Sequence, residues 1–164
     1  MFRRNALHTV IALTAVAALT ACPSRAPAPQ PLPATLSQTP SLNTFNQLAT
    51  EAGLADTLKA AGPYTVFAPS DAAFRALPAK TLAELKADPA QLKSVLSYHI
   101  VPARLAAADI KPGNAKTLQG ADLALARAGS FVTVEDAMAE TTDINASNGV
   151  VHVIDRVLVP PRKK

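Results

Sequence analysis

The chain has 164 residues, with 16 basic and 12 acidic side chains and a formal net charge of +4 at pH 7. Six of the basic residues lie outside residues 41–160, which leaves 10 basic against 12 acidic side chains in that stretch. With only 4% aromatic residues as well, the chain lacks the basic, aromatic face that is typical of nucleic-acid-binding proteins. The single cysteine, Cys22, excludes an intramolecular disulfide and a metal site built on several thiolates.

The N-terminal segment, residues 1–21, has the pattern of a lipoprotein signal peptide. Arg3 and Arg4 precede an apolar run over residues 6–19, which is shorter than the ~20 residues that a helix needs to cross a membrane. The run ends in Leu-Thr-Ala-Cys, which resembles the bacterial lipoprotein box, in which the cysteine is acylated and becomes the first mature residue. We therefore expect an exported protein that is anchored through acylated Cys22 to the cell membrane or the outer membrane.

The composition then divides the mature chain into three parts. Residues 22–40 comprise the lipidated cysteine and a proline-rich linker, and this proline density predicts a semi-rigid polyproline II stalk. Residues 41–160 have the mixed composition of one folded domain, and a chain of that length buries roughly two-thirds of its unfolded surface. Residues 161–164 form a basic tail, which we expect to be a solubilising end.

Within the domain, helical patterns come first and strands later. Apolar residues at spacings of three and four predict helices over residues 45–52, 54–61 and 71–77, and two more within residues 79–97. Ser70 is placed to cap the third of these helices, and Asp71 in its first turn suits the positive end of the helix dipole. Residues 64–68 form a β-branched and aromatic run that predicts a strand. After residue 98 short strands and turns follow, so the sequence predicts an α+β fold.

Three segments in this order resemble one known family. They are TVFAPSDAAF (residues 65–74), the dipeptide Tyr98-His99, and NGVVHVIDRVLVP (residues 148–160). They resemble the first homology segment, the tyrosine-histidine motif and the second homology segment of the fasciclin, or FAS1, domain. The resemblance covers residues 41–160 and implies a wedge of β-strands with several helices packed on it, in which the two homology segments are neighbouring central strands. It also implies an extracellular or surface-anchored adhesion or matrix protein, which agrees with the signal peptide.

The two homology segments carry few charges and are therefore predicted to be strands covered on both faces. We expect their apolar side chains to form the core: Phe67, Phe74, Val151, Val153, Val157 and Val159. Asn148-Gly149 predicts a turn, because both residues tolerate positive φ. By the strand period of two, His152 lies with Val150 and Ile154 on the face opposite the core valines, which predicts a structural histidine with a hydrogen-bond partner.

A hydrolase could be assembled from Ser70, Asp71, His99 and His152, since a catalytic triad needs only a nucleophile, a base and a carboxylate. Ser70 lies in Ala-Pro-Ser-Asp-Ala, however, and not in the glycine-flanked elbow that exposes a nucleophile. A metal site would need both histidines to converge with a carboxylate such as Asp71 or Asp155, and their spacing has no ligand pattern. We therefore predict a protein that is not an enzyme and has no metal or cofactor.

His99 follows an apolar tyrosine at the entrance to a strand, so it is expected to be partly buried and hydrogen-bonded. We predict that its ring bonds near Asp71 or the Ser70 turn, joining the strand to the capped helix. On this hypothesis, His99→Ala lowers stability by ~1 to 3 kcal/mol.

Asp143-Ile144 resembles an Asp-Ile motif that is linked to integrin recognition in animal family members. Thr141-Thr142 stands where those motifs have Glu-Pro, so Asp143 is more typical of a turn former, and the pair is kept only as a possible partner contact. The predicted function is binding to another protein, a matrix or a polysaccharide. The alternative is a small-ligand carrier or sensor that uses a groove between helices and sheet. The sequence makes no prediction of oligomeric state.

Overall fold

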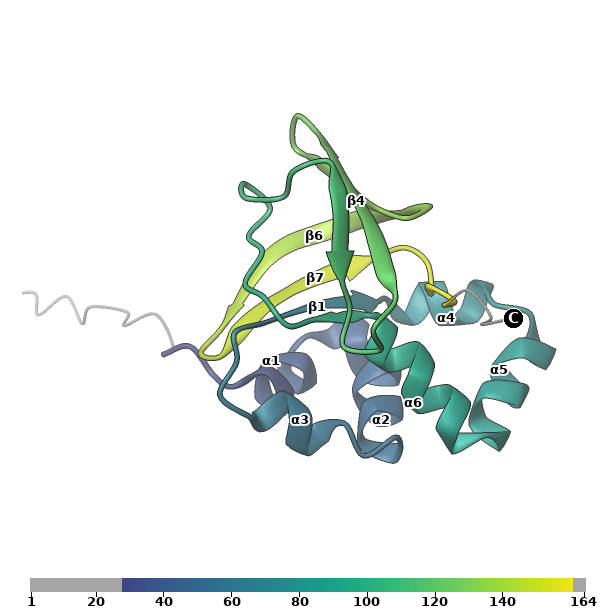
Figure 1. Ribbon diagram of the computed structural model, residues 1–164. Coiled ribbons are helices and arrows are strands. Elements are labelled where there is room, and N and C mark those ends of the chain that lie inside the picture. The colour runs from purple at the N-terminus through teal and green to yellow at the C-terminus, as the bar shows by residue number, and fades with distance from the viewer. Residues whose placement is uncertain (1–27, 161–164) are drawn as a thin grey trace, which may run out of the picture.

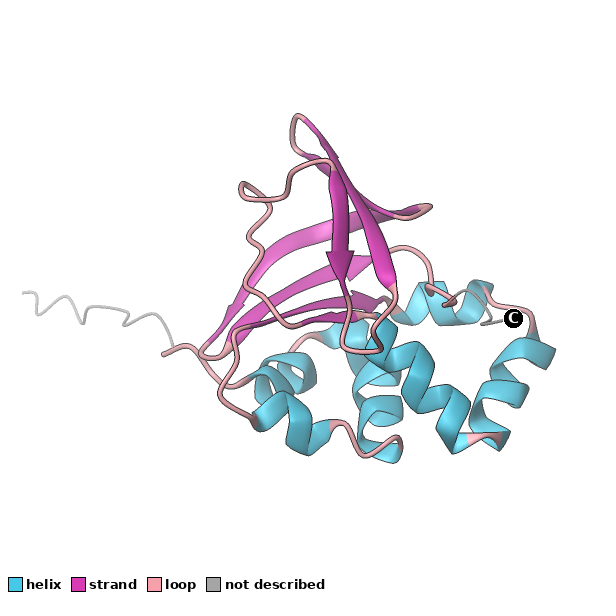
Figure 2. Ribbon diagram, in the orientation of Figure 1, coloured by secondary structure: helices cyan, strands magenta, loops and turns pink. Residues whose placement is uncertain are grey.

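The computed structural model describes residues 28–160 (Figure 1), so the signal peptide, Cys22 and the basic tail lie outside the described residues. Helices pack against one end of a strongly twisted seven-stranded sheet, and the opposite end of the sheet projects away from them (Figure 2). The α+β fold class is confirmed. No helix within residues 28–160 is both long and apolar enough to span a membrane.

Local sequence signals fix the starts of two helices. Ser70 caps α4 by accepting a hydrogen bond from the Ala73 N–H at 3.2 Å, and the carboxylate of Asp88 caps α6. The cap at Ser70 was predicted, whereas the cap at Asp88 was not; serine and aspartate both satisfy N–H groups that have no partner inside the helix. The helices are α1 (Leu32–Gln38), the 3-10 turn η1 (Pro40–Leu42), α2 (Asn43–Glu51), α3 (Ala55–Lys59), α4 (Asp71–Ala76), α5 (Ala79–Ala87) and α6 (Pro89–Tyr98).

The strands form one sheet in the order β2-β1-β7-β6-β5-β4-β3. The pair β1–β7 is parallel, and the other neighbouring pairs are antiparallel. The two homology segments are therefore neighbouring strands, as the family resemblance implied. The strands are β1 (Tyr64–Pro69), β2 (Ile100–Val101), β3 (Gly113–Lys116), β4 (Asp122–Ala128), β5 (Phe131–Val134), β6 (Ala137–Ala146) and β7 (Gly149–Ile154).

The two faces of β1 and β7 enter different cores. Val151 and Val153 join the core between the sheet and the helices. Phe67 and Ile154 join a second core, which the sheet forms with Tyr98 and the later strands. The predicted burial on both faces is thus confirmed for these strands. Val159 was predicted to be buried but is 59% exposed, because β7 ends at Ile154 and the chain leaves the sheet.

Helix α1 corrects the predicted boundary of the linker. Residues 32–38 were expected to be polyproline II, yet they form a helix whose Leu32 and Leu36 are fully buried in the first core. Pro31 and Pro33 are compatible with this helix, because proline at the start of a helix loses no internal hydrogen bond. The spacing of four between the two leucines places both on the face that packs on the domain.

Candidate functional site

Ser70 and Asp71, at the start of α4, both have structural partners. The Ser70 hydroxyl oxygen caps the helix, and a carboxylate oxygen of Asp71 accepts a hydrogen bond from the Thr44 N–H at 2.8 Å. Asp71 therefore ties α4 to the start of α2. The side chains proposed as nucleophile and carboxylate are both occupied in holding helices in place.

His99 is fully buried at the end of α6 and bridges two distant parts of the chain. Its Nδ1–H donates to the Val95 carbonyl at 2.8 Å, and its Nε2 accepts from the Leu158 N–H at 3.0 Å. The predicted bond near Asp71 or Ser70 is wrong. As the C-cap of α6, the ring reaches back one helical turn, and its other nitrogen faces the segment after β7. Burial lowers the pKa of His99 to about 4.

His152, in the middle of β7, is also fully buried and hydrogen-bonded on both sides. Its Nε2–H donates to the Leu105 carbonyl at 2.8 Å, and its Nδ1 accepts from the Asp143 N–H at 3.3 Å. The ring stacks on Phe67 of β1, with centroids 5.4 Å apart. Burial lowers the pKa of His152. The predicted structural histidine is confirmed, and it holds the connection between β2 and β3 against the sheet.

The residues of the possible hydrolase are thus not brought into one constellation, since each bonds to a different backbone group. Within residues 28–160 there is also no group of three or more His, Cys, Asp or Glu side chains that could hold a metal ion. Asp155, a suggested metal ligand, accepts a hydrogen bond from the Met138 N–H at 2.7 Å and so ties the end of β7 to the start of β6.

Tyr98, the other half of the tyrosine-histidine motif, belongs to the second core. Its hydroxyl lies 3.1 Å from both a carboxylate oxygen of Glu135 and the Asp122 carbonyl. Burial, followed by the hydrogen bond to Glu135, raises the pKa of Tyr98 to about 12. The motif therefore joins α6 to both cores, with His99 contacting Phe45 of α2 and Tyr98 reaching the β4–β5 region.

Asn148 connects three segments with one side chain. Its Oδ1 accepts from the Leu32 N–H at 2.9 Å, and its Nδ2 donates to the carbonyls of Leu58 at 2.7 Å and Ala60 at 2.9 Å. It thereby joins the β6–β7 turn to α1 and to the end of α3. The sequence placed Asn148 in a turn but did not reveal this role, because its partners are far away along the chain.

The turn itself uses Ser147 and Asn148 between the paired residues Ala146 and Gly149. The turn was predicted at Asn148-Gly149 and lies one residue earlier, because Gly149 already belongs to β7. Neither Asn148 nor Gly149 is among the residues with positive φ. Gly149 is needed for another reason, since a Cβ there would collide with the Tyr64 carbonyl oxygen.

Asp143 lies in an irregularity of β6 rather than in the predicted turn. Its φ is 59°, and the pairing with β7 shifts between Thr141 and Ile144. One carboxylate oxygen accepts from the Ala107 N–H at 2.8 Å. This β-bulge delivers the Asp143 N–H to His152, so the suggested partner contact has a structural role. Ile144 is half-buried and packs on the first core.

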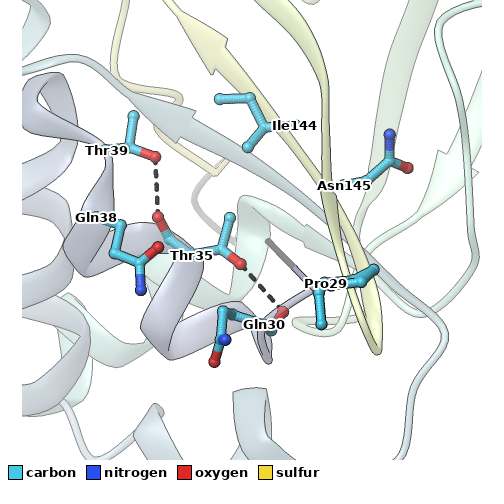
Figure 3. Close-up of a pocket in the computed structure, with 8 residues that line it drawn as sticks. Pro29, Gln30, Thr35, Gln38, Thr39, Ile144 and Asn145 are labelled. Carbon is cyan, nitrogen blue, oxygen red and sulfur yellow. Dashed lines mark hydrogen bonds between the residues drawn. The ribbon is translucent and has the colours of Figure 1, made fainter. Parts of the chain in front are cut away.

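A surface hollow of about 250 Å³ lies between the segment before α1, α1 itself and β6 (Figure 3). The Thr35 hydroxyl donates to the Gln30 carbonyl, and the Thr39 hydroxyl donates to the Thr35 carbonyl. Asn145 accepts from Arg104 at 2.8 Å. Much of the polar lining is therefore already paired within the chain.

Strands β3, β4 and β5, called the ribbon below, have one face that is exposed to solvent, called the bare face. Leu123 and Leu125 of β4 are buried in the second core, whereas the alanines between and after them are exposed. On that outer face, Phe131 of β5 is 61% exposed and Met138 of the adjoining β6 is 46% exposed. Sequence reasoning missed this surface, although the alternation of apolar and small residues over 122–134 signals a strand with one free face.

The fasciclin domain family model matches residues 40–160. Among curated proteins, the chain is 42% identical over 112 residues to Protein sll1483 of Synechocystis sp., covering 67% of this chain and 62% of that protein. It is 39% identical over 130 residues to Immunogenic protein MPB70 of Mycobacterium bovis, covering 76% and 66%. Cell surface glycolipoprotein MPB83 of the same organism is 39% identical over 130 residues, with 76% and 58% covered. The chain thus spans about three fifths of the length of these relatives.

Among solved structures, the fold is similar to that of a FAS1 domain pair from the insect cell adhesion molecule Fasciclin I. The TM-score is 0.64 at 16% identity, over 80% of this chain and 51% of that one.

Proposed function

The chain belongs to the fasciclin (FAS1) domain family, and from this premise we propose that it is a lipid-anchored binding module outside the cytoplasm. Its role is cell adhesion or contact with an extracellular protein or polysaccharide. A relative at 39% identity is a cell surface glycolipoprotein, which supports surface display. The Leu-Thr-Ala-Cys box supports acylation of Cys22 as the anchor, since two or three acyl chains hold a protein stably on a membrane.

The observation that carries a binding role is the contrast between two buried histidines that are hydrogen-bonded to the backbone and an apolar surface that is exposed to solvent. His99 and His152 are buried and bonded to backbone groups, so neither is available to a substrate. Phe131, by contrast, exposes a large apolar ring to solvent. Exposed apolar patches on a rigid fold are typical of protein–protein contacts.

The alternative, a small-ligand carrier, would use a hollow such as the one between α1 and β6. At about 250 Å³, that hollow is smaller than ligand sites, which span roughly 300 to 1,000 Å³ and are mostly apolar. Hollows of about 330 Å³ beside Pro63 and about 370 Å³ beside α4 only just exceed the lower end of this range. The hydroxyls of the hollow between α1 and β6 are bonded internally, so it offers few converging groups to a ligand. We therefore favour a macromolecular partner.

The test compares whole cells that express the full chain, the Cys22→Ser variant or no protein. We expect the full chain to fractionate with membranes and to increase cell aggregation or attachment to surfaces, whereas Cys22→Ser is released and gives the background of the null strain. Equal aggregation and attachment in all three strains would overturn the adhesion role. Membrane fractionation that is unchanged in Cys22→Ser would overturn the lipid anchor.

A further inference from the structure

We propose that the end of the domain at which the chain enters lies on the headgroups of the membrane that holds acylated Cys22, with the Arg104 guanidinium on a lipid phosphate. The contact rests on the proposed lipid anchor and adds an orientation to it. This end, called the entry end below, consists of the β6–β7 turn, α1 and the segment from the end of α3 to the start of β1. Figure 1 shows it on the opposite side of the molecule from α4 and α5.

The chain is fixed to the entry end from Gln30 onward. The Gln30 carbonyl accepts a hydrogen bond from the Ser147 N–H at 2.8 Å, and the Leu32 N–H donates to Asn148 Oδ1 at 2.9 Å. Leu32 is then fully buried at the start of α1. The tether between the proposed lipid and the domain is therefore residues 23–29, and not the whole proline-rich segment.

This short tether limits how the domain is oriented on the membrane. At ~3.5 Å per residue when fully extended, it keeps Gln30 within roughly 28 Å of the anchored cysteine. A compact domain of this length is roughly 35 Å across. If α4 and α5 faced the membrane, Gln30 would lie farther from the surface than the tether reaches. The entry end is therefore the end that the tether holds near the headgroups.

A hollow at the entry end has the groups that bind a phosphate. Its volume is about 330 Å³, and its lining residues are Ala61, Gly62, Pro63, Arg104, Ser147 and Asn148. The Arg104 side chain is exposed, and its Nη2–H donates to Asn145 Oδ1 at 2.8 Å, which sets the direction of the guanidinium. A guanidinium matches the geometry of phosphate oxygens with paired N–H groups. The exposed Ser147 beside it adds a hydroxyl donor.

The charges around this hollow favour an anionic surface. Among the described residues, no Asp or Glu lines it. Of the acidic groups on the neighbouring elements, Asp56 of α3 forms an ion pair with Lys59 at 3.4 Å, and Asp143 of β6 accepts from the Ala107 N–H. Arg104 and, in the tether, Arg25 together outweigh the remaining charge of Asp143. Basic residues beside a membrane anchor are attracted to anionic headgroups.

The test measures which end of the domain lies near the headgroups. The full chain, purified with its acyl chains, is placed in vesicles of phosphatidylcholine and phosphatidylglycerol that contain a lipid with a spin-labelled headgroup, which quenches nearby fluorophores. Cys22 is the only cysteine and its sulfur is acylated, so a cysteine introduced by Ala61→Cys or Lys86→Cys takes a fluorophore selectively. Both positions are exposed, but Ala61 lies at the entry end and Lys86 on α5. We expect roughly threefold stronger quenching at position 61 than at position 86.

The phosphate contact is tested in the chain that carries the label at position 61. Arg104→Gln should lower the quenching by about half, because the domain then loses its contact with the headgroups. Arg75→Gln is the matched control, since it removes the same charge from an exposed position on α4, and it should leave the quenching unchanged. Circular dichroism checks that every variant is folded.

Two results would overturn the inference while leaving the anchor in place. Equal quenching of the two labels would show that the entry end does not face the membrane. If Arg104→Gln leaves the quenching unchanged but weakens attachment of cells, Arg104 meets an external partner and not a lipid phosphate. Mass spectrometry of the purified chain separates these failures from that of the proposed function, because an unmodified Cys22 would remove the anchor and the inference together.

Discussion

The parallel pair β1–β7 and the ribbon belong to one sheet but use their faces differently. In β7 every residue is buried, and in β1 every residue after Tyr64 is buried. By contrast, the first four residues of β4 and the residues of β5 alternate between more and less exposed positions, and the last three residues of β4 are all exposed. The pair is enclosed by helices on one side and by the second core on the other. The ribbon covers that second core with one face and leaves the other free. Substitutions in the first region should therefore change stability, and substitutions on the bare face should change recognition.

The largest effect is expected where α1 closes the helical core. Leu36→Ala should lower the free energy of unfolding by about 2 to 5 kcal/mol, because a fully buried leucine leaves a cavity. Urea denaturation measures the change. Leu118→Ala is the matched control, since Leu118 is 38% exposed and its truncation should cost less. Equal losses for the two variants would show that α1 is not part of the cooperative fold.

Low pH should destabilise the region around β1 and β7 through His99. An unfolded histidine has a pKa near 6.5, and burial lowers that of His99 to about 4, so the unfolded chain binds more protons between these values. Stability is therefore unaffected by this group above pH 6.5 and falls as the pH drops toward 4, by roughly 3 kcal/mol in total. His152 is shifted in the same direction and adds to the loss.

The test of this acid effect is His99→Gln, in which an amide can still donate to Val95 and accept from Leu158 but does not titrate. The decrease in unfolding free energy between pH 7 and pH 4 should be smaller than in the wild type. An unchanged pH profile in the variant would mean that other groups cause the acid sensitivity.

Asn148→Ala should lower the free energy of unfolding by about 2 kcal/mol, because it leaves the Leu32 N–H and two carbonyls without their partner. Thermal or urea denaturation measures this. Asn145→Ala, three residues earlier, removes exposed side-chain bonds and should cost less. A reversed order would contradict the role of Asn148 in joining α1 and α3 to the sheet.

The smallest effect on stability is expected on the bare face. Phe131→Ser should change the free energy of unfolding by less than about 0.5 kcal/mol, because the ring is 61% exposed. Denaturation of this variant beside Leu36→Ala compares the two regions directly. A large loss for Phe131→Ser would show that the ring packs on the fold, and that the ribbon is not divided into a core face and a free face.

Local chemistry made much of the fold predictable. The cap at Ser70, the strand that precedes it and the second homology segment, which carries few charges, all depend on neighbouring residues. Helix α1 was not predicted, because the high proline content of this segment indicated polyproline II and the helical spacing of Leu32 and Leu36 was not used. Prolines at the start of a helix do not oppose its formation.

The parts of the site that were missed depend on contacts that no local pattern encodes. The ring of His99 meets an N–H that lies 59 residues away along the chain, and Asn148 meets carbonyls that lie 90 and 88 residues away. The bulge at Asp143 likewise serves His152 across a strand pair. The residue types indicated that partners were needed, but only the fold determines which atoms supply them.

The Asn148-Gly149 pair also bears on how the protein ages. Asparagine followed by glycine is chemically prone to lose its side-chain amide nitrogen, because the next backbone nitrogen can attack the side-chain carbon when the chain is mobile. Here the amide is held by Leu32, Leu58 and Ala60, and Gly149 is fixed in a strand. Unfolding releases both groups, and the aspartate that forms would place a negative charge against two carbonyl oxygens. Long periods in the unfolded state should therefore convert Asn148 irreversibly to aspartate in part of the molecules, and these molecules should refold less well.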